Sequence, residues 1–179
     1  MSGALRHGSR PTLAVVGNGQ LAIDDPRYAL ARELGRRAID AGFRLVCGGR
    51  GGVMEAACLG AHESEAYREG DTVGILPGSD RSAANPWVDI PLPTGLGDAR
   101  NALVAKADVV VAVGGGAGTL SEMALAWVHG RPLIALACEG WSGRLGGESL
   151  DGTSDPDARR VTGAETAEEA IAAALAATT

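Results

Sequence analysis

Two glycine-rich segments of the sequence carry a glutamate at the same spacing. Gly48-Gly49-Arg50-Gly51 is followed by Glu55, and Gly115-Gly116-Ala117-Gly118 is followed by Glu122, so the pattern G-G-x-G-x-x-x-E occurs twice. Glycines let backbone N–H groups approach a phosphate, and the N–H groups of a first helical turn lie at the positive end of the helix dipole. We therefore predict a site for a phosphorylated ligand, formed by both segments.

The predicted ligand-binding residues belong to three glycine turns, of which the earliest is Gly17-Asn18-Gly19-Gln20. Arg50 is the charged member and is placed to meet a phosphate; the alternative is a solvated loop arginine. Because the segments match neither the dinucleotide fingerprint nor the P-loop, a tight strand-to-helix turn without a ligand is the other interpretation. The predicted set is Gly17, Gly19, Gly48, Gly49, Arg50, Gly51, Gly115, Gly116, Gly118 and Thr119.

Charged residues near these turns are candidates for chemistry. Asp98 is expected to cap a helix that runs through Ala107, which places Arg100 and Asn101 in its first turn. Arginine at a helix N-terminus opposes the helix dipole, so we expect Arg100 to contact the ligand, the alternative being a surface salt bridge. Glu122 lies one turn into the next helix, where the dipole and Arg100 are expected to keep its carboxylate ionised.

Buried strands and amphipathic helices alternate along the chain. Short apolar runs predict parallel strands. Capping signals predict the helices between them. The clearest signals are Pro26 after Asp24 or Asp25, and the capping box Thr166–Glu169. Residues 53–64 and the segment that Thr119 opens are expected to be helical. The predicted strands are Thr12–Val16, Phe43–Cys47, Thr72–Leu76, Trp87–Ile90, Val109–Val113 and Leu133–Ala137, and the last helix is Ala167–Ala176.

This alternation predicts an α/β fold, a single-domain doubly wound (Rossmann-like) parallel sheet with helices on both faces and the ligand at the carboxyl edge. Residues 1–11 are expected to form a flexible N-terminal tail and residues 12–179 one domain. Residues 139–160 are rich in Gly, Ser and Asp and predict a mobile loop or lid.

Composition narrows the function. A net charge of −6 argues against nucleic acid as a partner. Because no long apolar span is present, we expect no membrane partner and a cytoplasmic location. The cysteines at positions 47, 58 and 138 predict buried free thiols, and the scattered histidines predict no metal site. Lys106 is the only lysine and precedes a strand, which disfavours pyridoxal phosphate chemistry.

The segments GGRGGVMEAA, TGLGDARN and GGGAGTLSEMALAW, in this order, resemble the Lonely Guy superfamily, whose members are often mislabelled as lysine decarboxylases. The resemblance covers about residues 13–136. GILPGSDRSAANPWVDI followed by TGLGDARN looks most like the branch of the molybdenum-cofactor carrier proteins. The Lonely Guy enzymes hydrolyse nucleoside 5′-monophosphates to base and ribose 5-phosphate, and the resemblance implies catalytic roles for Arg100, Glu122 and Glu55.

The sequence departs from the enzyme pattern at two positions. Gly114 stands where the enzymes have proline, and Asn101 stands where they have a lysine after the arginine. Two functions remain open: a protein that binds a nucleotide-like ligand, such as a molybdenum-cofactor carrier, and a phosphoribohydrolase, which would need no cofactor. The resemblance also implies a homo-oligomer, a dimer or tetramer.

Overall fold

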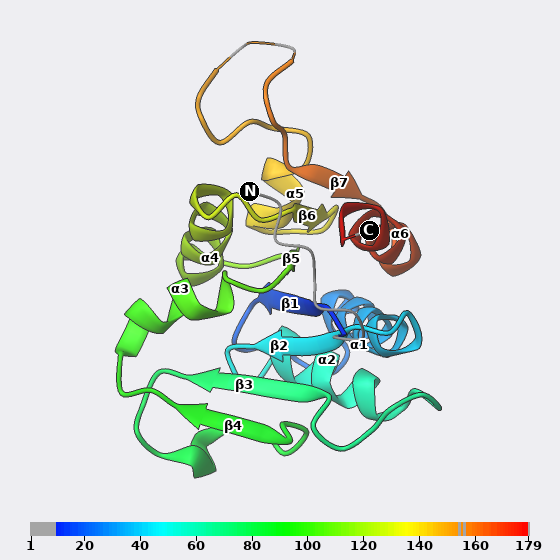
Figure 1. The fold of residues 1–179 in the computed structure, drawn as a ribbon, viewed down its shortest axis with the longest axis vertical. Coiled ribbons are helices and arrows are strands. Elements are labelled where there is room, and N and C mark those ends of the chain that lie inside the picture. The colour runs from blue at the N-terminus through cyan, green and yellow to red at the C-terminus, as the bar shows by residue number, and fades with distance from the viewer. Residues whose placement is uncertain (1–9, 154, 156, 179) are drawn as a thin grey trace.

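The computed structural model describes residues 10–153, 155 and 157–178. Its strands form one seven-stranded sheet in the order β4-β3-β2-β1-β5-β6-β7 (Figure 1), and every neighbouring pair is parallel. The predicted α/β fold is therefore confirmed. The strands are β1 (Thr12–Gly17), β2 (Arg44–Cys47), β3 (Thr72–Leu76), β4 (Ile90–Pro93), β5 (Val109–Val113), β6 (Leu133–Leu136) and β7 (Thr162–Ala164).

Helices cover both faces of the sheet, because the strand residues are apolar in both directions. Alternate residues of β5 pack against α1, α2 and α6 on one face, and the others pack against α3 and α4 on the opposite face. The helices are α1 (Pro26–Asp40), α2 (Val53–His62), α3 (Asn101–Val104), α4 (Ala117–Val128), α5 (Trp141–Leu145) and α6 (Ala167–Thr178), with 3-10 turns η1 (Arg81–Ala83) and η2 (Gly97–Arg100).

Two predicted helix starts are confirmed. Asp25 caps α1, its side chain accepting from the Arg27 N–H at 2.9 Å, and Pro26 occupies the first helical position. At α6, the Glu169 N–H donates to the Thr166 hydroxyl at 3.1 Å, which is one half of the predicted capping box, whereas the Glu169 Oε2 accepts from the Glu165 N–H at 2.7 Å instead of from the Thr166 N–H.

The helix predicted from Asp98 through Ala107 is wrong in extent. Asp98 supplies no capping hydrogen bond, and the segment forms the one-turn η2 followed by α3, which ends at Val104. The chain leaves the helix there because Asp108 is tied to the start of β1, its Oδ2 accepting from both the backbone N–H and the hydroxyl of Thr12. Arg100 therefore ends a 3-10 turn instead of opening a long helix.

Three other predicted boundaries also move. The strand placed at Trp87–Ile90 begins only at Ile90, because Asp89 uses its side chain to accept from the Gly70 and Thr72 N–H groups. The helix expected to open at Thr119 begins two residues earlier, with Gly116 as its N-cap. Residues 139–160 contain α5, and β7 follows in a segment where no strand was predicted.

Residues 1–9 of the expected N-terminal tail lie outside the described residues. Arg10 is anchored: it donates to the Gly42 and Phe43 carbonyls and pairs with Asp71. Among the described residues, no helix is long and apolar enough to cross a membrane.

Candidate functional site

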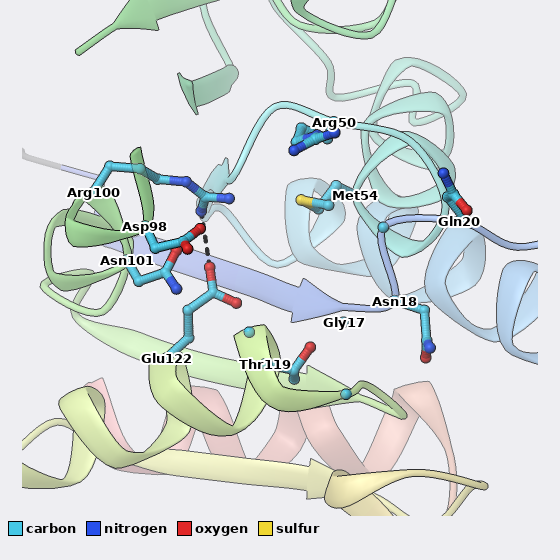
Figure 2. Close-up of a pocket in the computed structure, with 13 residues that line it drawn as sticks. Gly17, Asn18, Gln20, Arg50, Met54, Asp98, Arg100, Asn101, Thr119 and Glu122 are labelled. Atoms are coloured by element: carbon cyan, nitrogen blue, oxygen red, sulfur yellow. Dashed lines mark hydrogen bonds and ion pairs between the residues drawn. The ribbon is translucent and has the colours of Figure 1, made fainter. Parts of the chain in front are cut away.

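A cavity of about 550 Å³ opens at the carboxyl edge of the sheet, where the turn after β1 meets those after β2 and β5. Strand order reverses between β1 and β5, so this is the topological switch point at which such sheets bind ligands. Figure 2 shows the residues that line it. They are Gly17, Asn18, Gly19, Gln20, Arg50, Met54, Asp98, Arg100, Asn101, Gly116, Gly118, Thr119 and Glu122.

The N-terminus of α4 is one wall of the cavity. Its N-cap is Gly116, which has no side chain that could accept from the first N–H groups of the helix. These N–H groups also have no partner within the helix. A Cβ atom at Gly116 or Gly118 would meet no atom within 4 Å, so both backbones are open to an incoming group. Thr119 is only 3% exposed, yet its hydroxyl has no partner among the described residues. These groups together form a set of donors without protein partners, which suits an anion.

Arg100 and Glu122 form a buried ion pair beside this wall. The Arg100 Nη1 donates to the Glu122 Oε1 at 2.9 Å, and the two residues are 8% and 6% exposed (Figure 2). Arg100 therefore does form a salt bridge, but the pair is buried and does not lie on the surface as that alternative supposed. Burial raises the pKa of Glu122 to about 7, although the Arg100 charge and hydrogen bond oppose the shift. The expectation of a fully ionised carboxylate is wrong, because desolvation outweighs the favourable neighbours.

The guanidinium of Arg100 lies directly against the backbone of Gly48. A Cβ atom at Gly48 would come within 2.5 Å of the Arg100 Nη1, so only glycine leaves room for the side chain. The Arg100 Nε is buried and has no hydrogen-bond partner among the described residues. A buried cation whose one carboxylate partner is only partly ionised at neutral pH is under-compensated, and a ligand anion in the cavity would relieve this cost.

A short chain of hydrogen bonds joins η2 and α3 to α4. The Asn101 side-chain N–H donates to the Ser121 hydroxyl, which donates to the Gly118 carbonyl, each over 2.7 Å. Asn101 is therefore fixed against the wall that Gly118 forms.

The turn between β2 and α2 contributes less to the cavity than its sequence predicted. It supplies Arg50 and, from the first turn of α2, Met54. The Asn85 side chain braces this turn by donating to the Arg50 carbonyl at 2.9 Å. Five predicted site residues do not line the cavity: Gly48, Gly49, Gly51, Gly115 and Glu55.

Asn18 is a site residue that sequence reasoning did not select. Its Oδ1 accepts from the Gly115 N–H at 2.7 Å, and its backbone carbonyl accepts from the Val53 N–H at 2.9 Å. One residue of the first turn therefore links both glycine-rich turns. Its position between Gly17 and Gly19 was the only available signal. Gln20, Met54, Asp98 and Asn101 also line the cavity without having been selected as site residues.

Side chains that could bind a metal ion do not cluster in the described part of the chain. Among the described residues, no group of three or more His, Cys, Asp or Glu side chains could hold a metal ion. The three cysteines are free; Cys47 and Cys58 are buried and Cys138 is partly buried.

Residues 10–171 match the family model of the SLOG cluster4 family. A protein of Archaeoglobus fulgidus is 36% identical over 125 residues, covering 69% of this chain and 78% of that protein. The molybdenum cofactor binding protein of Rippkaea orientalis has a similar structure, with 35% identity, a TM-score of 0.81 and coverage of 96% and 99% of the two chains. The molybdenum cofactor carrier protein of Chlamydomonas reinhardtii gives 34% identity, a TM-score of 0.75 and coverage of 93% and 98%.

Proposed function

Because this chain belongs to the SLOG cluster4 family, we propose that it binds a phosphorylated, nucleotide-like small molecule, and that this ligand is the molybdenum cofactor. The observation that carries the proposal is the N-terminus of α4, where open glycine backbones and the unpartnered Thr119 hydroxyl face a cavity. These donors suit a terminal phosphate.

The cavity fits such a cargo in size and in chemistry. Its volume of about 550 Å³ lies in the range of small-molecule sites. The cofactor is a pterin that carries a phosphate and holds its molybdenum through its own dithiolene sulfurs, so the protein need not supply metal ligands. The cofactor binding protein and the cofactor carrier protein, at 35% and 34% identity, support the same ligand class. Arg50 and Arg100 would add positive charge along the walls.

Cofactor loading tests the proposal directly. The protein is incubated with molybdenum cofactor released from a molybdoenzyme and then separated by gel filtration. Molybdenum and pterin should elute with the protein in equimolar amounts, measured by elemental analysis and by pterin fluorescence. Thr119→Val, which keeps the side-chain shape, should reduce retention, whereas Thr119→Ser should preserve it. Wild-type protein that retains neither component would refute cofactor binding.

Phosphate recognition is tested separately by calorimetry with AMP and adenosine at one salt concentration. A site built on the α4 N-terminus should bind the nucleotide at least about tenfold more tightly than the nucleoside, the ratio expected for a charged hydrogen bond. Equal affinities would contradict the assignment of the phosphate site.

Hydrolysis of nucleoside monophosphates is the second candidate, favoured by the pKa of Glu122. A buried carboxyl group with a pKa of about 7 is suited to general acid–base catalysis at neutral pH. Water would add to C1′ as the bond from C1′ to the base nitrogen breaks, with Glu122 accepting the water proton and the departing nitrogen taking up one proton, so that ribose 5-phosphate and free base result.

This second function is tested by incubating the protein with nucleoside monophosphates and measuring the release of free base by chromatography. Glu122→Gln should abolish the release while nucleotides still bind. Because Asn101 replaces the lysine of the Lonely Guy enzymes, we expect low turnover on common nucleotides. Wild-type protein that releases no base from any monophosphate would leave carrier binding as the only proposal.

A further inference from the structure

Beside the guanidinium of Arg100, the wall formed by η2 and α3 also presents hydrogen-bond acceptors to the cavity. Asp98 lines the cavity, and its carboxylate has no hydrogen-bond or ion-pair partner among the described residues. Glu122 uses one carboxylate oxygen to accept from Arg100, which leaves the other oxygen available. Figure 2 shows Asp98, Arg100 and Asn101 on one side of the cavity and Asn18 and Gln20 on the other.

The hydrogen-bond chain fixes which end of the Asn101 amide serves the ligand. Ser121 has one hydroxyl proton, and it donates that proton to the Gly118 carbonyl. It must therefore accept from Asn101, so the amide NH2 faces Ser121. The remaining group of the Asn101 side chain is the carbonyl oxygen, another acceptor at the cavity wall.

This wall and the α4 N-terminus call for different parts of one ligand. A carboxylate repels a phosphate, and the N–H groups of the first turn of α4, which have no partner within the helix, attract it. The phosphate therefore belongs at Gly116, Gly118 and Thr119, and the part that faces Asp98 must be rich in N–H donors. Two adjacent donors match the two oxygens of one carboxylate.

We propose that Asp98 binds the 2-amino-4-oxopyrimidine edge that pterins and guanine share, accepting from the ring N–H and the neighbouring 2-amino group. The Asn101 carbonyl oxygen is the second acceptor of the same wall. This inference rests on the proposed phosphate site and names the class of ring that goes with it. Adenine presents one amino group beside a ring acceptor, and hypoxanthine has the ring N–H without the amino group, so neither satisfies the carboxylate.

Calorimetry with GMP, IMP and AMP, at one pH and salt concentration, tests the assignment. The three ligands share ribose and phosphate and differ only at the ring edge. GMP should bind at least about tenfold more tightly than IMP, because only guanine offers a 2-amino N–H to the second oxygen of the Asp98 carboxylate, and hydrogen bonds to charged groups are the strong ones. Asp98→Asn should bring this ratio close to one. Glu65→Gln, which removes one exposed negative charge outside the cavity, should leave the ratio unchanged.

A second arm separates the two sources of this ring edge. Labelled GMP is bound first and then displaced either by 6-hydroxymethylpterin phosphate or by unlabelled GMP. If the pterin phosphate displaces it at the lower concentration, pterins are the preferred class. If unlabelled GMP does so, guanine nucleotides are preferred. If AMP binds better than adenosine but GMP and IMP bind alike, this inference falls and the phosphate site stands. If neither GMP nor the pterin phosphate binds, both fall.

Discussion

The two glycine-rich turns share a sequence pattern but differ in what their glycines do. In the β5–α4 turn, Gly116 and Gly118 are open to the cavity. In the β2–α2 turn, Gly49 has a φ of +72° and packs against Leu76, and Gly51 packs against the Gly19 carbonyl. The first pair exposes a backbone to the cavity, whereas the second pair permits a tight turn.

The first glycine of the pattern has the same role in both turns. Gly48 makes room for the guanidinium of Arg100, and Gly115 makes room for the side chain of Thr119, which would lie 2.3 Å from a Cβ atom there. Each therefore seats a side chain of the site without lining the cavity itself. The duplicated pattern thus encodes one turn that we propose binds the ligand anion and one supporting turn.

The aligned glutamates offer the largest expected contrast. The pKa of Glu122 rises from 4.5 to about 7 in the folded state, so between these values the folded protein holds a proton that the unfolded chain has lost. Stability must then fall as the pH rises from about 4.5 through 7, by roughly 3 kcal/mol for this group. Glu122→Gln removes the titration and should stabilise the protein at pH 8 by that amount, with little change at pH 4.5.

Urea unfolding at pH 4.5 and pH 8 measures this difference. Glu55→Gln removes the aligned carboxylate, which lies outside the cavity, and is the matched control for the loss of one charge. A Glu122→Gln variant with the same pH dependence as the wild type would show that Glu122 does not titrate in this range.

The aligned pair Gly49 and Gly116 tests the two backbone roles. Alanine at Gly49 would adopt a positive φ and bring its Cβ within 2.7 Å of the Leu76 Cδ2. We expect Gly49→Ala to lower the free energy of unfolding by about 2 kcal/mol or more. Gly116 has a φ of −102° and open space around it, so Gly116→Ala should change stability by less than about 0.5 kcal/mol. Equal losses in denaturant unfolding would contradict the division of roles.

The sequence predicts most of the fold because its signals are local. Apolar runs such as Val109–Val113 and the cap at Asp25 each determine an element without help from distant residues. β7 escaped prediction because Thr162–Ala164 is short and contains a glycine, so its pairing with β6 depends on a neighbour in space.

The site was predictable to a lesser extent. The glycine turns indicated where the cavity lies, but the role of Asn18 depends on hydrogen bonds to two distant segments. The pKa of Glu122 also depends on burial, which spacing along the sequence does not reveal. The sequence indicates the helix dipole and the ion pair, which both lower the pKa of Glu122. Desolvation, which raises this pKa, has the larger effect.

A smaller effect concerns the charge that a side chain would add at the β5–α4 turn. Gly118 is the second residue of α4, so Gly118→Asp should not lower stability, because glycine is a poor helix former and an acidic side chain favours a helix N-terminus. The same carboxylate would repel a ligand phosphate. We expect AMP to bind at least about tenfold more weakly to Gly118→Asp than to Gly118→Asn, which has nearly the same shape and no charge. Similar affinities for the two variants would place the phosphate elsewhere.

The smallest expected effect concerns Asn18, the residue that connects the two turns. Asn18→Ala keeps the backbone bond to Val53 and removes the side-chain bond to the Gly115 N–H, so it should lower the free energy of unfolding by about 1 kcal/mol. Asn18→Asp retains an acceptor for Gly115 but adds a negative charge at the cavity. It should therefore preserve stability and weaken AMP binding several-fold. Because one variant loses the link and the other keeps it, denaturant unfolding and calorimetry on the pair separate the structural role from the electrostatic one. An Asn18→Ala variant as stable as the wild type would mean that the two turns hold their positions independently.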